Sequence, residues 1–205
     1  THTFALAGPR GSGWYRLAGV QSGGLALEHA LRLLDATIGE AVAALSEGVR
    51  ADDPIFVPYL AGERTPFMAA GLQGAWHGLG LSTDRAALLR SVLEGVAQAA
   101  ALGVAAVRDS GVSLPPVVPL VGGGSHDPSF RQLLADATGL SLGVVDAPDA
   151  AVIGAAILAR GAVRADEPVA VTAVVDPTTS GSTMLAERRA RLVALVNDQL
   201  EGERP

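Results

Sequence analysis

The most informative stretch of this sequence is Val117-Val118-Pro119-Leu120-Val121-Gly122-Gly123-Gly124-Ser125. Its first five residues form a continuous apolar run, which predicts a strand buried on both faces. Three consecutive glycines then break the strand, because glycine favours tight turns and brings no Cβ into the way of a neighbour. Pro128 suits the first turn of a following helix, and Gly139 suits its end. A strand, a glycine turn and a helix in this order are typical of α/β proteins.

The segments around this stretch continue the same alternation. Apolar spacing predicts a helix over residues 83–110 capped by Ser82 or Thr83, a strand over 142–145 and a helix over 149–160. Because helices and apolar strands alternate, we expect an α/β domain with a partly parallel sheet.

Both ends of the chain carry additional elements. Before residue 83 we expect a strand over 14–20, one helix over 25–45 and a short strand over 75–79. After residue 166 an irregular segment leads to an amphipathic helix over 184–200. The apolar stripe of that helix holds Leu185, Leu192, Leu195, Val196 and Leu200, and its opposite face holds Glu187, Arg188, Arg191 and Asp198.

Composition narrows the functional classes. The 205 residues are 49% hydrophobic and 18% charged, which suits a packed core, and the net charge of −6 makes nucleic acid an unsuitable partner. The most apolar window, residues 91–107, contains Glu94 and Gln98 and is shorter than the roughly 20 apolar residues of a membrane span. We therefore expect a buried helix there, with no membrane partner.

Cysteine usage and histidine spacing bear on location and on metals. Cysteine is absent, which excludes disulfides and thiolate metal sites and favours a cytoplasmic protein. The four histidines are scattered without the spacing of a zinc site, so no metal site is expected in this chain. The chain opens with Thr1 and not with Met, which favours a fragment of a longer protein.

The glycine turn has three possible interpretations. It is either a simple strand-to-helix turn or a place where the backbone and the helix dipole after it receive an anionic ligand such as phosphate. A Rossmann dinucleotide site is the third possibility, with Gly122 and Gly124 in the fingerprint and Asp146 as the acidic residue beyond it. The third fingerprint position holds Asp127 in place of glycine, so this last interpretation fits less well.

Five short motifs that occur in a fixed order along the chain are more informative together than any one of them. They are HTF at residues 2–4 with Trp14 after it, VPYLAGERTP at 57–66, GAWHGL at 74–79 followed by LLRSVLE at 88–94, GGGSHDPSFRQLLAD at 122–136, and AAVIGAAILAR at 150–160. In this order they resemble motifs of the FGGY family of carbohydrate kinases, and among its members those of xylulokinases. The resemblance runs from residue 2 to about 162 and continues more weakly in the tail.

The resemblance implies a fold and a set of site residues. The fold is an actin-like (ribonuclease H-like) α/β ATPase domain, with a mixed sheet flanked by helices, over residues 1–166, and the tail 167–205 carries one amphipathic helix. ATP would bind in a crevice of this domain. The residues that the resemblance places at the nucleotide are Gly24, Glu28, Gly123, Gly124, Ser125 and Asp127.

The resemblance also implies the chemistry of the longer protein. It would transfer a phosphoryl group from ATP to a sugar hydroxyl, with Mg²⁺ held mainly outside this chain, and the sugar it implies is D-xylulose. The catalytic base would precede residue 1, so the chain alone is expected to be inactive. The first strand of the sheet would be missing too, and the free edge near residues 14–20 predicts a homo-oligomer or pairing with the N-terminal domain.

Other interpretations of the chain and of one loop stay open. The chain is either half of a kinase, a non-catalytic nucleotide-binding or structural module, or a Rossmann-type oxidoreductase domain. Glu63 and Arg64 are either a solvated turn with a local ion pair or, as the resemblance suggests, a structural clasp near the domain interface.

Overall fold

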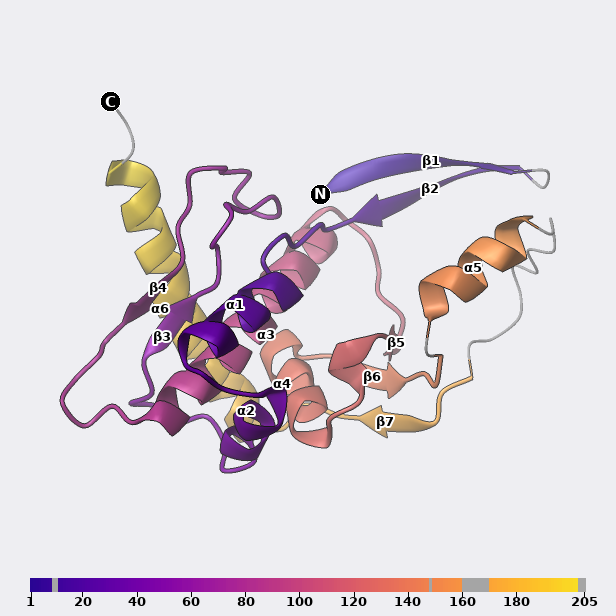
Figure 1. Cartoon of the computed structure of the whole chain (residues 1–205). Coiled ribbons are helices and arrows are strands. Elements are labelled where there is room, and N and C mark those ends of the chain that lie inside the picture. The colour runs from indigo at the N-terminus through magenta and orange to yellow at the C-terminus, as the bar shows by residue number, and fades with distance from the viewer. Residues whose placement is uncertain (9–10, 148, 160–169, 203–205) are drawn as a thin grey trace.

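Helices and short strands alternate along the chain, as the sequence predicts (Figure 1). The computed structural model describes residues 1–8, 11–147, 149–159 and 170–202. The strands are β1 (His2–Gly8), β2 (Gly11–Leu17), β3 (Ile55–Val57), β4 (Ala75–His77), β5 (Val117–Leu120), β6 (Ser141–Val144) and β7 (Ala173–Val175). The helices are α1 (Gly24–Leu33), α2 (Ile38–Leu45), α3 (Arg85–Asp109), α4 (Pro128–Thr138), α5 (Ala150–Ala159) and α6 (Thr179–Gly202), and a short 3₁₀ turn, η1, covers Gly123–Ser125.

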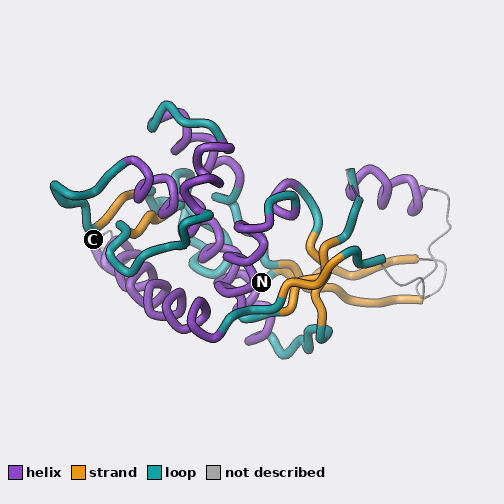
Figure 2. Tube along the Cα trace, turned by 90° about the horizontal axis from the view of Figure 1, so that it is seen from below, coloured by secondary structure: helices purple, strands orange, loops and turns teal. Residues whose placement is uncertain are grey.

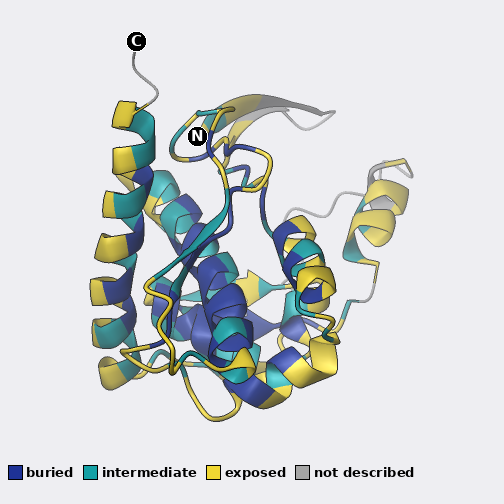
Figure 3. Cartoon of the chain, turned by 60° about the vertical axis from the view of Figure 1, so that its left-hand side comes forward, coloured by how far each residue is buried: buried dark blue, intermediate teal, exposed yellow. Residues whose placement is uncertain are grey.

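The expected long helix is α3, and it lies in the core. It contacts α1, α2, α4 and β3, and it is buried along most of its length (Figure 3). Although α3 is long and apolar enough to cross a membrane, 72% of its most apolar window is buried inside the fold. Its N-cap is Asp84, whose carboxylate accepts a hydrogen bond from the Ala87 N–H at 2.7 Å. The prediction of Ser82 or Thr83 as the cap was therefore wrong.

The mixed sheet consists of β5, β6 and β7 in that order. β5 and β6 are parallel, and β7 pairs with β6 in the antiparallel direction. The prediction that residues 117–121 are buried on both faces was wrong, since Pro119 is exposed and the rest of β5 is half-buried. The reason is that β5 lies at the edge of this sheet, where a proline without an N–H is tolerated.

The strand expected over residues 14–20 is β2, shifted towards the N-terminus. It forms an antiparallel hairpin with β1, in which Phe4 opposes Tyr15 and their rings stack with centroids 5.2 Å apart. Trp14 is 73% exposed. Figures 1 and 2 show the hairpin and α5 projecting from the body that the other helices form. Whether the outer edges of the hairpin pair with another chain stays a prediction.

The single helix expected over residues 25–45 is in fact two helices, α1 and α2. Asp35 takes a left-handed conformation with φ of 46°, which ends the first helix. Thr37 and Glu40 then form a capping box that starts the second. A hydrogen bond from Arg85, helped by hydrogen bonds from Thr37, lowers the pKa of Glu40 to about 2, so this carboxylate stays charged. The local caps outweigh the continuous apolar pattern.

The C-terminal segment is packed against the rest of the fold. β7 pairs with β6, and α6 contacts α4 and β3, with its inner face buried and its outer face exposed (Figure 3). Leu185, Leu192 and Val196 are buried, in agreement with the predicted stripe. The expected domain boundary between residues 166 and 167 lies outside the described residues.

The prediction that Arg188 lies on the polar outer face of α6 was wrong, because its side chain is buried. Its guanidinium contacts both carboxylate oxygens of Glu94 on α3, at 2.6 and 2.7 Å. It also donates to the backbone carbonyls of Ala51, Asp53 and Pro54 at 3.0–3.1 Å. Beside it, the buried carboxylate of Asp53 binds Arg90. These polar groups connect α6, α3 and the loop before β3, and each charge has a partner of opposite sign.

We predict that Arg188→Met strongly destabilises the chain. The substitution leaves Glu94 buried without its partner and three carbonyls without their donor, which is expected to lower the free energy of unfolding by about 3–5 kcal/mol. Urea unfolding followed by circular dichroism measures this. Arg191→Met, at an exposed position of the same helix, is the matched control and should change the free energy by less than about 0.5 kcal/mol. Equal losses in the two variants would contradict the role given to Arg188.

Candidate functional site

The glycine turn after β5 has the conformation that its sequence predicts. Gly122 has φ of 88° and ψ of −174°, a region that only glycine enters without strain. The N–H and the hydroxyl of Ser125 both donate to the Gly122 carbonyl, at 2.9 and 2.7 Å. The turn is thus closed by its own hydrogen bonds, and it leads directly into α4.

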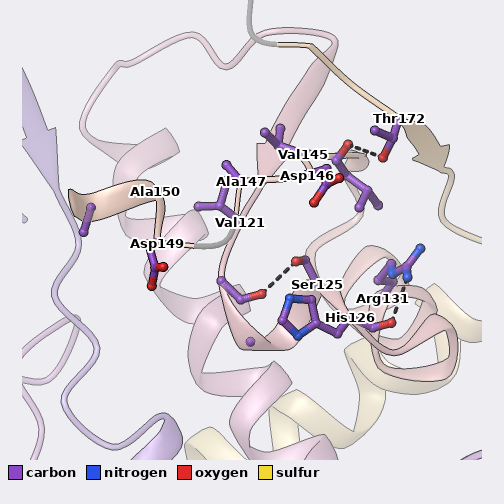
Figure 4. Close-up of a pocket in the computed structure, with 14 residues that line it drawn as sticks. Val121, Ser125, His126, Arg131, Val145, Asp146, Ala147, Asp149, Ala150 and Thr172 are labelled. Carbon is purple, nitrogen blue, oxygen red and sulfur yellow. Dashed lines mark hydrogen bonds between the residues drawn. The ribbon is translucent and has the colours of Figure 1, made fainter. Parts of the chain in front are cut away.

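A pocket of about 820 Å³ opens at this turn (Figure 4). β5 and β6 are parallel, so their carboxyl ends meet at one edge of the sheet, which is where open α/β sheets bind ligands. One wall is residues 121–126, and the opposite wall is residues 144–147 with the start of α5. Thr172, just before β7, completes the pocket and is held by hydrogen bonds from its N–H and its hydroxyl to the Val144 carbonyl.

The sequence-predicted site residues are only partly gathered here. Gly123 and Ser125 line the pocket. Ser125 is buried, and its hydroxyl donates a hydrogen bond to the Gly122 carbonyl. Gly124 faces inward, since a Cβ there would lie 3.1 Å from the Phe130 ring. Asp127 caps α4 behind the turn.

Gly24 and Glu28 are not among the residues that line this pocket. They lie in the first turns of α1, which packs on α3. The structure thus separates these two residues from the pocket wall, and their contact with a nucleotide stays a prediction.

The position considered for an anion at the start of α4 is occupied by the carboxylate of Asp127. The Asp127 carboxylate accepts a hydrogen bond from the Phe130 N–H at 2.9 Å, and Pro128 has no N–H to offer. A phosphate at this helix end would meet a negative charge in place of free donors. Whether this helix end receives phosphate stays a prediction, and the Asp127 carboxylate opposes it.

The rest of the pocket is a mixture of apolar surface and carboxylates. Val121, Val145 and Ala147 supply flat apolar wall, and Asp146 and Asp149 are exposed acids in it. The Arg131 guanidinium donates to the His126 carbonyl at 2.9 Å and forms no ion pair with the described acids. Such a pocket suits an uncharged ligand moiety with N–H or O–H donors better than a phosphate group.

Comparison with known proteins decides which family shares this arrangement. Residues 6–163 match the C-terminal domain of the FGGY family of carbohydrate kinases. The chain belongs to the FGGY family. Two xylulose kinases are similar to it in sequence: that of Escherichia coli (strain K12), 34% identical over 162 residues, and that of Klebsiella pneumoniae, 36% identical over 160 residues. These alignments cover 78% and 76% of this chain.

A solved structure is similar over nearly the whole chain. The crystal structure of a xyloylose kinase from Brucella ovis superposes with a TM-score of 0.85 and 29% identity, covering 98% of this chain and 43% of that one. The predicted actin-like α/β fold is thus confirmed. The chain spans about a third of the length of the two curated FGGY relatives, 33% of each.

The contacts of the loop at residues 62–65 decide between a solvated turn and a structural role for Glu63. Glu63 is 3% exposed, and one carboxylate oxygen accepts from the N–H groups of Gln21 and Arg64, each at 2.7 Å. Ser22 donates to the Gly62 carbonyl, and the Thr65 N–H donates to the Gly19 carbonyl. The solvated turn with an ion pair was the wrong alternative. The loop instead fixes residues 19–22, which lead into α1.

Sequence reasoning did not assign Asp146, Arg131 or Thr172 to an FGGY site. Asp146 could have been found, because it directly follows the second of two parallel strands. Thr172 could not, since its place depends on the pairing of β7 with β6, which are distant in the sequence. For metals, the residues that the structure describes contain no group of three His, Asp or Glu side chains able to hold an ion.

We predict that Gly122→Ala destabilises the chain by about 1–3 kcal/mol, because a Cβ is strained at this backbone conformation. Gly123→Ala is the matched control. No atom lies within 4 Å of a Cβ there and φ is not positive, so a change below about 0.5 kcal/mol is expected. Thermal unfolding of both variants tests the pair, and an unchanged melting temperature for Gly122→Ala would refute the backbone argument.

Proposed function

We propose that the longer protein to which this chain belongs transfers a phosphoryl group from ATP to a sugar hydroxyl, and that this chain supplies the pocket for the adenine nucleotide. One observation carries the proposal. In a member of a carbohydrate kinase family, an open pocket lies at the carboxyl ends of two parallel strands, beside a glycine turn whose backbone a ligand can approach.

The sugar that we propose is D-xylulose. The similarity to the two bacterial xylulose kinases, each over about three quarters of this chain, supports it. Following the resemblance to the carbohydrate kinases, we assign the sugar contacts and the catalytic base to parts of the protein beyond this chain.

The pocket suggests how the nucleotide is oriented. The apolar wall at Val121, Val145 and Ala147 can accept the flat face of adenine, whereas the acids Asp146 and Asp149 repel phosphates. We therefore place the nucleoside in the pocket and the phosphates outside it. A Mg²⁺ ion, when bound, neutralises the charge of the transferred phosphoryl group, and we assign its ligands to the phosphates and to residues outside this chain.

We predict that the chain binds ADP and does not bind NAD. Isothermal titration calorimetry should give a one-to-one isotherm with ADP and no saturable heat with NAD at the same concentration. Gly123→Val places a branched side chain at the pocket wall and should weaken ADP binding about tenfold or more. Gly80→Val, at a position equally open but outside this pocket, is the control and should bind ADP like the parent chain. Binding of NAD in preference to ADP would instead favour a Rossmann-type domain.

We further predict that this chain alone does not phosphorylate D-xylulose. A coupled assay of ADP release should show no sugar-dependent rate, because the base that accepts the hydroxyl proton is assigned to another segment. A longer protein that joins the sugar-binding half to residues 1–205 should show such a rate. Sugar-dependent turnover by the chain itself would place the base within it and contradict the division of labour proposed here.

A further inference from the structure

The end of β6 carries a carboxylate that nothing in the pocket uses. Asp146 follows β6 by two residues, and it makes no hydrogen bond or ion pair with the residues that the structure describes. Three other acids near the sheet are engaged: Asp127 caps α4, Asp136 accepts from the Thr178 N–H, and Asp176 accepts from the Ser141 hydroxyl. An exposed carboxylate in a pocket wall, with its oxygens unoccupied, is available to accept hydrogen bonds from a ligand.

The strand register places Asp146 level with the glycine turn. Leu120 of β5 pairs with Val144 of β6, and the Val145 N–H donates to the Leu120 carbonyl at 3.1 Å. Two residues beyond that pair, Gly122 and Asp146 leave adjacent parallel strands at the same edge. In Figure 4 the Asp146 carboxylate lies across the open pocket from Ser125 and His126. A ligand that rests on the glycine turn therefore has this carboxylate beside it.

The chemistry of a nucleoside narrows what this carboxylate can accept. Asp146 and Asp149 disfavour a phosphate beside them, and the adenine face is matched by the apolar wall. The remaining polar part is the ribose, whose two neighbouring hydroxyls can donate to the two oxygens of one carboxylate. An acid at the tip of the second strand after a glycine turn binds ribose in this manner in other nucleotide-binding sheets.

We infer that Asp146 is a specificity-determining residue of the pocket, which accepts hydrogen bonds from the ribose hydroxyls of the bound nucleotide. The inference rests on the proposed nucleotide site. Asp198 on α6 is an exposed acid that does not line this pocket. It therefore provides a matched control acid.

The test is calorimetric binding of ADP and of 2′,3′-dideoxy-ADP to the 205-residue chain. The parent chain should bind ADP about tenfold or more tightly than the dideoxy nucleotide, since hydrogen bonds to a charged group are lost. Asp146→Ala should bring this ratio close to one, mainly by weakening ADP, and Asp146→Asn should give an intermediate ratio. Asp198→Ala should keep the parent ratio. Circular dichroism melting should show both alanine variants folded, because both side chains are exposed.

The outcomes separate the two proposals. If ADP binds but the ratio is near one in the parent chain, or survives Asp146→Ala, the role of Asp146 is refuted while the nucleotide site stands. If the ratio falls equally in the Asp198→Ala variant, the effect is general electrostatics and the assignment to Asp146 is likewise refuted. If neither nucleotide binds the parent chain, the proposed function fails, and the inference fails with it.

Discussion

The buried contact between Arg188 and Glu94 ties the C-terminal segment to the core. Arg188 also donates to three carbonyls of the loop before β3, so one guanidinium fixes α6 against α3 and against that loop. Because α6 is fixed, the segment before it can return along β6, where β7 pairs and Thr172 reaches the pocket. The Arg188–Glu94 pair therefore helps to position Thr172 in the pocket wall. Arg188, β7 and Thr172 all lie beyond residue 163, where the family match ends.

The sequence predicted what depends on local pattern. The order of elements from α3 to α5 and the glycine turn at Gly122 follow from apolar spacing and from backbone preference, both of which act over a few residues. One local signal was overlooked. Asp127, directly before Pro128 and three residues before Phe130, is a good N-cap, and this role conflicts with phosphate binding at the same helix end. The capping box of Thr37 and Glu40 is likewise a local signal that a second helix begins within residues 25–45.

Features that depend on distant partners could not be predicted in the same way. The burial of Arg188 requires Glu94 to lie opposite it, and an arginine on the polar face of an amphipathic pattern gives no sign of this. The exposure of β5 depends on its edge position in the sheet, since the same apolar run in a central strand would be covered. The pocket wall joins residues 121–123, 125–126, 131, 144–147, 149–151 and 172, and only the fold brings these together.

In the proposed nucleotide site, charge would orient the ligand. Asp146 and Asp149 line the pocket, and Arg131, which also lines it, donates to the His126 carbonyl. A triphosphate placed beside these two acids would be repelled by them, whereas a ribose and a base would find acceptors and apolar surface. In the proposed site the phosphates would therefore point out of the pocket, towards the part of the protein that supplies the positive charge and the sugar. A chain that holds the nucleoside and leaves the phosphates exposed is suited to be one side of a kinase cleft, with the chemistry taking place at its boundary.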